Sequence, residues 1–269
     1  MSAPDSDAAE LDLDAYLRRI GCDCTPGATR AGLDALHLAH ATHIPFENLD
    51  VLLGRPINLA LARLQDKLVR DRRGGYCFEH NLLFAAALRR IGFAVTPLAA
   101  RVRYRARRVL PRTHMLLCVD VGGERVITDV GFGLAGLLAP MALAAGAESR
   151  QFAWRYRLAE RDGSWTLQMH GDAGWIDLYE FTLEPQHAAD IEMANYYAST
   201  HPDSRFVHTL TVQLPAPQVR YALRNRELTE DRGGAPTTRV LAGDDELSRV
   251  LAEVFGLRLP AGTAFGVRD

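Results

Sequence analysis

The stretch RGGYCFEHN (residues 73–81) runs directly into the apolar segment LLFAAAL (82–88), and together they predict a buried helix that begins near Cys77. Gly92 follows that helix and can take the left-handed conformation of a C-terminal cap. A cysteine in the first turn of a helix lies beside unpaired backbone N–H groups and the positive end of the dipole, which favour the reactive thiolate. Cys77 is therefore a candidate nucleophile, and a small core cysteine behind an ordinary loop is the alternative.

A candidate base comes from residues 114–130, HMLLCVDVGGERVITDV, which predict a hairpin closed by Gly122 and Gly123. With a two-residue turn, His114 and Asp129 become diagonal neighbours on one face of the hairpin, about 7 to 8 Å apart at the backbone. A loop one residue longer or shorter would place them on opposite faces. Asp129 lies in an apolar setting where an unpaired carboxylate is costly, so we expect it to pair with His114. A solvated aspartate and a separately satisfied histidine remain the alternative.

Together, Cys77, His114 and Asp129 fit the pattern of nucleophile, base and orienting acid. In that pattern histidine takes the thiol proton, while aspartate fixes the tautomer of the ring and stabilises the imidazolium. Spacing along the sequence does not show whether Cys77 reaches His114.

The composition of the 269-residue chain is that of an ordinary globular protein, with 48% hydrophobic residues and a net charge of −2. This net charge produces no overall positive electrostatic potential, so neither nucleic acid nor an anionic membrane is an implied partner. No apolar stretch approaches the roughly 20 residues that span a bilayer, and the acidic start does not resemble a secretion signal, so we expect a cytoplasmic protein. Four cysteines are too few for a disulfide framework. Lys67 is the only lysine, which excludes a Walker-type phosphate loop.

The hydrophobic periodicity divides the chain into three regions and predicts an α+β protein. Residues 1–92 are typical of a small helical domain, residues 93–200 of an antiparallel sheet or barrel, and residues 201–269 of a mixed α/β region. In the third region, residues 219–228 are expected to form a strand. The arginine stripe at residues 101–108 continues the alternation of the second region, which favours a solvated strand face, although arginines also suit phosphate groups.

Six stretches resemble the arylamine N-acetyltransferases and occur in that family's order. They are YLRRIG (16–21), IPFENLD (44–50), RGGYCFEHN (73–81), THMLL (113–117), DVGFG (129–133) and STHPDSRF (199–206). The resemblance implies an N-terminal helical bundle, a central antiparallel β-barrel and a C-terminal α/β lid. A cysteine-protease-like site of Cys77, His114 and Asp129 would lie between the first two parts. It also implies a ping-pong reaction, in which the cysteine takes acetyl from acetyl-CoA as a thioester and an aromatic amine or hydrazine then receives it.

The resemblance assigns further residues to substrate binding. Phe132 and Phe46 would line the acceptor pocket, where they can stack on an aryl amine. Gly131 and Gly133 would allow close approach of the pantetheine and pyrophosphate of CoA. Acetyl-CoA is then a cosubstrate, no metal is required, and the oligomeric state is left open.

Other residues in these stretches have a less defined role. Glu47 and Arg73 match family positions near the site, where they are expected to form a supporting ion pair or to be solvated. Arg205 stands where the family more often has proline. His80 lies three residues after Cys77, where it could perturb the titration of the thiol or point away. These features leave acceptor preference and CoA affinity open.

Two alternative functions compete with acetyl transfer. The same site could hydrolyse an aryl amide or close an amide bond within a polyketide chain, as relatives of this family do without CoA. A metal-binding module is a different class of protein, for which Cys22 and Cys24 with His37, His40 and His43 offer ligands. The one-residue spacing of the cysteines is unusual for structural zinc, and histidines on an alanine-rich helix are more often solvated.

Overall fold

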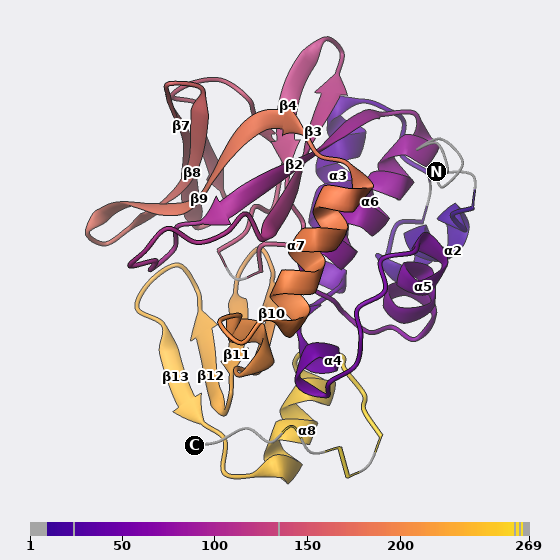
Figure 1. Cartoon of the computed structure of the whole chain (residues 1–269), viewed down its shortest axis with the longest axis vertical. Coiled ribbons are helices and arrows are strands. Elements are labelled where there is room, and N and C mark those ends of the chain that lie inside the picture. The colour runs from indigo at the N-terminus through magenta and orange to yellow at the C-terminus, as the bar shows by residue number, and fades with distance from the viewer. Residues whose placement is uncertain (1–9, 24, 134, 261, 264, 266–269) are drawn as a thin grey trace.

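The computed structural model describes residues 10–23, 25–133, 135–260, 262–263 and 265 (Figure 1). Helices dominate the first part of the chain. They are α2 (Leu13–Arg19), α3 (Arg30–His43), α4 (Leu49–Leu52), α5 (Leu61–Leu64), the π-helix η1 (Gln65–Arg70) and α6 (Cys77–Ile91). The predicted buried helix is confirmed as α6, which begins at Cys77 and is capped by Gly92 in a left-handed conformation with φ of 111°.

An eight-stranded antiparallel sheet follows and curls into a nearly closed barrel (Figure 1). Its order is β5-β4-β3-β2-β9-β8-β7-β6. The strands are β2 (Ala94–Val102), β3 (His114–Val121), β4 (Glu124–Thr128), β5 (Met141–Ala142), β6 (Glu148–Gln151), β7 (Trp154–Arg161), β8 (Ser164–Gly171) and β9 (Gly174–Pro185). Strands β3 and β4 form the predicted hairpin, with Val121 opposite Glu124 and Leu117 opposite Thr128. The expected register is therefore confirmed.

The barrel connects through α7 (Ala188–Thr200) to a second sheet of order β1-β10-β11-β12-β13. Its elements are β1 (Phe46–Glu47), η2 (Arg205–Val207), β10 (Thr211–Pro215), β11 (Arg220–Arg224), β12 (Glu227–Asp231), β13 (Thr237–Val240) and the closing helix α8 (Asp244–Glu253). Strand β1 comes from the helical part of the chain and pairs with β10, with Phe46 opposite Gln213. The helical region and the last region thus share one sheet.

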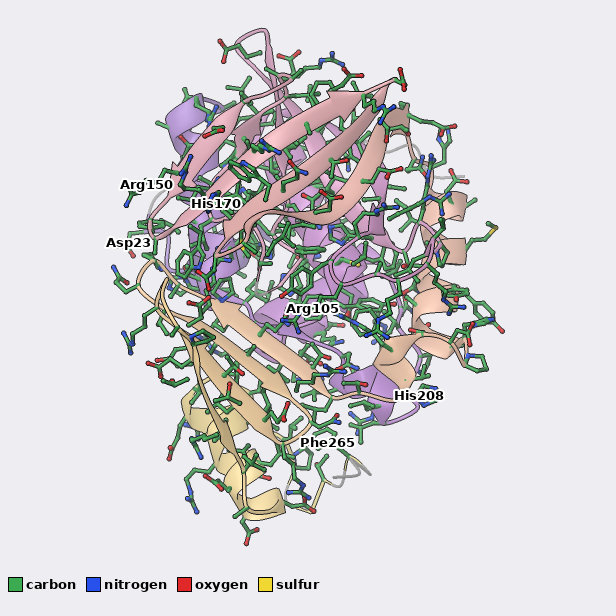
Figure 2. All side chains as sticks on the ribbon, turned by 90° about the vertical axis from the view of Figure 1, so that its left-hand side faces the viewer. Asp23, Arg105, Arg150, His170, His208 and Phe265 are labelled. Atoms are coloured by element: carbon green, nitrogen blue, oxygen red, sulfur yellow. The ribbon has the colours of Figure 1, made fainter. Side chains whose placement is uncertain are left out.

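Two expectations about strands were wrong. Residues 219–228 form a hairpin rather than one strand, because Asn225 takes a left-handed φ of 52° and turns the chain between β11 and β12. The arginine stripe leaves the barrel after Val102: β3 pairs with β2 only as far as Ala100, and beyond it β9 alone pairs with Arg101 and Val102. Figure 2 shows Arg105 on the side of the molecule between the two sheets.

From residue 103 onward the stripe is a loop whose arginines are partly paired. Nη1 of Arg103 lies 3.8 Å from Oε2 of Glu180, and Nη2 of Arg108 lies 3.3 Å from Oδ2 of Asp203.

None of the helices within the described ranges has the length and apolar character needed to cross a membrane.

Candidate active site

Cys77 lies at the meeting point of the helical region and the barrel. As the first residue of α6 it is almost fully buried, and its Sγ lies 3.6 Å from the carbonyl oxygen of Thr113, directly before β3. The thiol also lies close enough to the ring of His114 to contribute to the raised pKa of that histidine. The packing of α6 against β3 therefore brings together the two residues whose approach the sequence did not reveal.

His114 and Asp129 are in direct contact, as the hairpin register predicted. Nε2 of His114 lies 2.7 Å from Oδ2 of Asp129, and both side chains are buried. Burial alone would lower the pKa of His114, but the charge and hydrogen bond of Asp129 raise it to about 10. Burial likewise raises the pKa of Asp129, but the charge of His114 outweighs it and the pKa is lowered. Because Nε2 is engaged by the carboxylate, Nδ1 is the ring nitrogen left to face the thiol.

This ion pair gives a testable pH dependence. The pKa of His114 is about 10 in the folded protein and about 6.5 in an unfolded chain, so the folded state holds an extra proton between these values. The free energy of unfolding should therefore fall as the pH rises through this range. In urea unfolding at about pH 7 and about pH 9.5, we expect the parent to lose about 3 kcal/mol more than His114→Gln. Equal losses in the two proteins would contradict the ion pair.

Asn81 is a site residue that the sequence analysis missed. From the second turn of α6, its Nδ2 donates to Oδ1 of Asp129 at 3.1 Å and to the carbonyl oxygen of Met115 at 2.8 Å. Its Oδ1 accepts the N–H of Val130 at 3.3 Å. The sequence did contain a signal for Asn81, because a residue four positions after Cys77 lies on the same face of the helix as Cys77. Asn81 fixes the carboxylate of Asp129 from the side opposite His114.

The two glycines of the DVGFG loop pack against the protein's own chain. A Cβ built on Gly131 would lie 2.8 Å from both Cα of Cys77 and Nδ2 of Asn81. Gly133 has a φ of 85°, and a Cβ there would lie 1.8 Å from Oε1 of Gln213. At Gly131 the loop can therefore rest on the backbone of α6 only because it lacks a side chain, whereas at Gly133 the left-handed φ is what favours glycine.

Phe46 and Phe132 lie on two sides of one narrow cavity that also borders Asp129. The ring of Phe132 meets the ring of His114 edge-on, with centroids 5.0 Å apart. The ring of Phe46 stacks on His80 at 6.4 Å. The two aromatic residues that the resemblance assigned to acceptor binding thus line the same cavity, with Phe132 beside His114 and Phe46 beside His80.

The Gly74–Gly75 pair serves close packing rather than a tight turn. Neither glycine has a left-handed φ. A Cβ on Gly74 would lie 2.0 Å from the carbonyl oxygen of Pro45, and one on Gly75 would lie 2.6 Å from Oε2 of Glu79.

The expected ion pair between Arg73 and Glu47 is confirmed. Both Nε and Nη2 of Arg73 donate to Oε1 of Glu47, at 3.0 and 2.7 Å.

His80 belongs to a buried chain of hydrogen bonds. Its Nε2 lies 3.2 Å from the carbonyl oxygen of Pro45, and its Nδ1 lies 3.0 Å from Nε2 of His40. His40 continues to the hydroxyl of Tyr16 at 2.8 Å. Burial lowers the pKa of His80 to about 4, so the ring is neutral near pH 7. His80 therefore supports the segment before Phe46.

The positions of the candidate metal ligands do not support the metal-binding alternative. His37 and His40 are buried rather than solvated, which corrects the expectation for this helix, and each hydrogen-bonds within the protein. Cys24 lies outside the described residues. Across the part of the chain that the structure describes, no three side chains of ligating type are grouped as a metal site.

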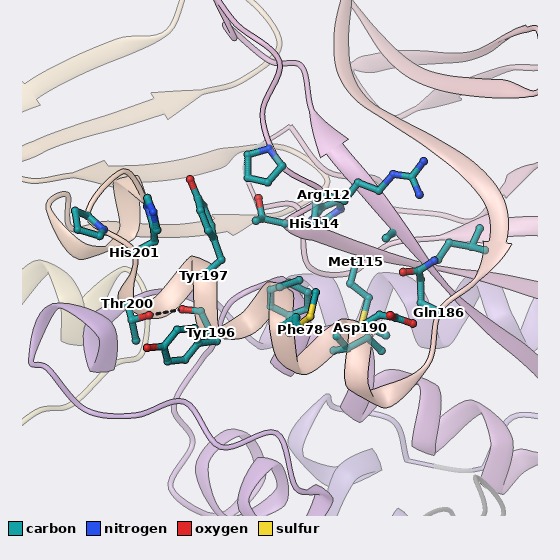
Figure 3. Close-up of a pocket in the computed structure, with 18 residues that line it drawn as sticks. Phe78, Arg112, His114, Met115, Gln186, Asp190, Tyr196, Tyr197, Thr200 and His201 are labelled. Atoms are coloured by element: carbon teal, nitrogen blue, oxygen red, sulfur yellow. Dashed lines mark hydrogen bonds between the residues drawn. The ribbon is translucent and has the colours of Figure 1, made fainter.

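A larger cavity of about 660 Å³ opens beside His114, between α7 and the start of β3 (Figure 3). Phe78 and Tyr197 lie on its walls, and Tyr196 lies at its rim with 71% of its surface exposed. Thr113, whose carbonyl faces Cys77, also lines it. A space of molecular size thus lies next to the buried histidine.

Comparison with known proteins places this chain in one class. The family model described as N-acetyltransferase matches residues 31–264. The arylamine N-acetyltransferase of Mycolicibacterium smegmatis is 42% identical over 231 residues, which cover 84% of each chain. The chain therefore belongs to the N-acetyltransferase family, and more narrowly it is an acyltransferase of the arylamine N-acetyltransferase type.

Solved structures agree with this assignment. The arylamine N-acetyltransferase structure of M. smegmatis superposes with a TM-score of 0.91 and 40% identity, covering 95% of this chain and 96% of that one. The Mycobacterium marinum enzyme in complex with CoA gives a TM-score of 0.87 at 36% identity, covering 91% of this chain and 92% of that one.

Proposed function

We propose that this enzyme transfers an acetyl group from acetyl-CoA to the nitrogen of aromatic amines and hydrazines, through an acetyl thioester on Cys77. The observation that carries the proposal is the position of Cys77, which begins α6 and lies against the start of β3, beside the hydrogen-bonded pair of His114 and Asp129. The M. marinum relative solved with CoA supports CoA as the carrier of the acyl group.

In the first half-reaction, the thiol proton resides on Nδ1 of His114 and the sulfur of Cys77 attacks the carbonyl carbon of acetyl-CoA. The tetrahedral oxyanion is stabilised by N–H groups of the first turn of α6, which have no partner within the helix. When the bond to the CoA sulfur breaks, the proton passes from His114 to the departing thiol. Acetyl-Cys77 and free CoA remain.

In the second half-reaction, the amine nitrogen attacks the thioester carbon. His114 takes a proton from the nitrogen and returns one to the sulfur of Cys77, so the product amide leaves and the thiol is restored. Asp129 holds the ring in the tautomer that allows both transfers. Phe46 and Phe132 contact the aryl ring of the acceptor. Exclusion of water by this buried site protects the thioester until an amine arrives.

Intact mass spectrometry tests the acyl-enzyme directly. We expect one acetyl group to be gained when the protein is mixed with acetyl-CoA and no amine, and to be lost when an aromatic amine or hydrazine is added. Cys77→Ala should gain none. Background acetylation should be low, because the single lysine is held between the carboxylates of Asp50 and Glu79.

The opposite result would favour a different reaction. If the protein gains no acetyl group and releases no CoA, the donor is not acetyl-CoA. Hydrolysis of aryl amides or amide closure at the same cysteine would then be the better assignment, and aryl amides would be tested next as substrates.

A further inference from the structure

Lys67 is the only lysine among the 31 basic residues of the chain, and it occupies an unusual position. It lies on the π-helix η1, a rare element that often occurs at functional sites. Its Nζ lies 2.8 Å from Oδ2 of Asp50 and 2.8 Å from Oε1 of Glu79. Only 17% of its side chain is exposed. The π-helix therefore directs one ammonium group between two carboxylates.

Glu79 connects this ion cluster to the catalytic helix. It is the third residue of α6, and its Oε2 accepts the N–H of Tyr76 at 3.0 Å. The same oxygen lies against Gly75, where even a Cβ would approach to 2.6 Å. One carboxylate oxygen of Glu79 thus fixes the backbone directly before Cys77, while the other is held by Lys67.

The charge of Lys67 is what allows Glu79 to stay in place. Burial raises the pKa of Glu79, and Lys67 opposes that rise. The other cations of the cluster are engaged elsewhere: Arg73 with Glu47 and Asp50, and Arg55 with Asp50. Without Lys67, the buried carboxylate of Glu79 would have to take up a proton or move towards water. Either change would loosen its hydrogen bond to Tyr76.

A lysine suits this position better than an arginine. An ammonium is a compact point charge with three donors, whereas a guanidinium is a planar fork that suits a single bidentate partner. Lys67 serves two carboxylates on different elements, α4 and α6, from one atom. The neighbouring Arg73 uses its fork differently, because Nε and Nη2 converge on one oxygen of Glu47 and only Nη2 also reaches Asp50, at 3.3 Å.

We propose that Lys67 is a positioning residue: through Glu79 and Tyr76 it fixes the start of α6 and so orients the thiol of Cys77. This role rests on Cys77 being the nucleophile of the proposed function. It assigns a task to a residue that does not touch the reacting atoms.

The test is the rate at which iodoacetamide alkylates Cys77, followed by mass spectrometry of its peptide. We expect Lys67→Met to lower this rate constant about tenfold, because an unpaired buried carboxylate disturbs the helix start. The double variant Lys67→Met/Glu79→Gln should recover most of the loss, since the glutamine carbonyl can still accept the N–H of Tyr76 without needing a cation. Arg63→Met is the matched control, because this exposed cation precedes η1 and pairs with the half-exposed Asp66 rather than with the cluster.

The direction of the change separates positioning from simple destabilisation. Local unfolding would expose Cys77 and raise its alkylation rate, whereas a misplaced thiol reacts more slowly. An unchanged or raised rate in Lys67→Met would overturn the proposal, as would a double variant no faster than the single one. If Lys67→Met does not fold, Lys67→Gln provides the same comparison. Alkylation needs no acetyl donor, so failure of the proposed transfer reaction would be seen separately, as alkylation without acetylation.

Discussion

Asp129→Asn should lower kcat for acetyl transfer by about 10³- to 10⁴-fold, the loss expected when the catalytic histidine is held in the wrong tautomer. The reason lies in the other partners of this carboxylate. Oδ1 accepts hydrogen bonds from Nδ2 of Asn81 and from the N–H of Gly131. An asparagine at this position would keep its carbonyl oxygen towards those two donors.

The amide NH₂ of the introduced asparagine would then take the place of Oδ2 and donate to Nε2 of His114. That ring nitrogen would have to be the acceptor, so the ring proton would move to Nδ1, which faces Cys77. A histidine protonated there as a neutral ring cannot accept the thiol proton. The substitution thus disables the base while changing hardly any volume.

Steady-state kinetics with acetyl-CoA and an aromatic amine measure this effect. The exposed Asp120 lies on the same strand as His114, so Asp120→Asn is a matched control that should retain full activity. Thermal unfolding of each variant checks that the fold is kept. A loss smaller than about tenfold in Asp129→Asn would mean that the tautomer of His114 is not set by Asp129.

The contact between His114 and Asp129 was predictable because it is local. A two-residue turn fixes the register of a hairpin, and register alone decides which side chains share a face. The approach of Cys77 to His114 was not predictable in this way. It depends on how α6 packs against β3, and no sequence spacing encodes that distance.

The errors have equally physical causes. Alternation at the arginine stripe has the period of a strand, but a strand also needs neighbours, and β3 pairs only as far as Ala100 and β9 only as far as Val102. Strand β1 is only two residues long, and it pairs with β10, which lies far along the chain. A strand this short has no detectable hydrophobic alternation, and no turn residues connect it to its partner, so the sequence does not predict it. Asn81 escaped notice because it lies beside an apolar helical run, where its polar role appears only once Asp129 is opposite it.

Gly131→Ala is expected to have the other large effect, and it separates two explanations for the glycine of the DVGFG loop. The resemblance assigns Gly131 to the approach of CoA. The structure shows instead that a Cβ would come within 2.8 Å of Cα of Cys77 and of Nδ2 of Asn81. Gly131 has no left-handed φ, so the backbone itself tolerates alanine, and the whole cost comes from contact with α6.

We expect Gly131→Ala to lower the free energy of unfolding by about 1 to 3 kcal/mol, as overpacking of a tight interior does. The larger consequence is for catalysis, because the added methyl group pushes the loop that carries Asp129 away from Cys77. Gly234→Ala is the matched control, since it also lacks a left-handed φ and a Cβ there would meet no atom within 4 Å.

The choice of acetyl donor distinguishes the two explanations. A simple aryl acetate delivers the same acetyl group to Cys77 without pantetheine or pyrophosphate. If Gly131 only makes room for CoA, the alanine variant should form the acyl-enzyme normally from the aryl ester and slowly from acetyl-CoA. If Gly131 is needed for the loop to rest on α6, both donors should react at least about tenfold more slowly, because His114 and Asp129 are displaced together from the thiol. We expect the second result, since the atoms nearest to the missing side chain belong to Cys77 itself and to Asn81, which holds Asp129.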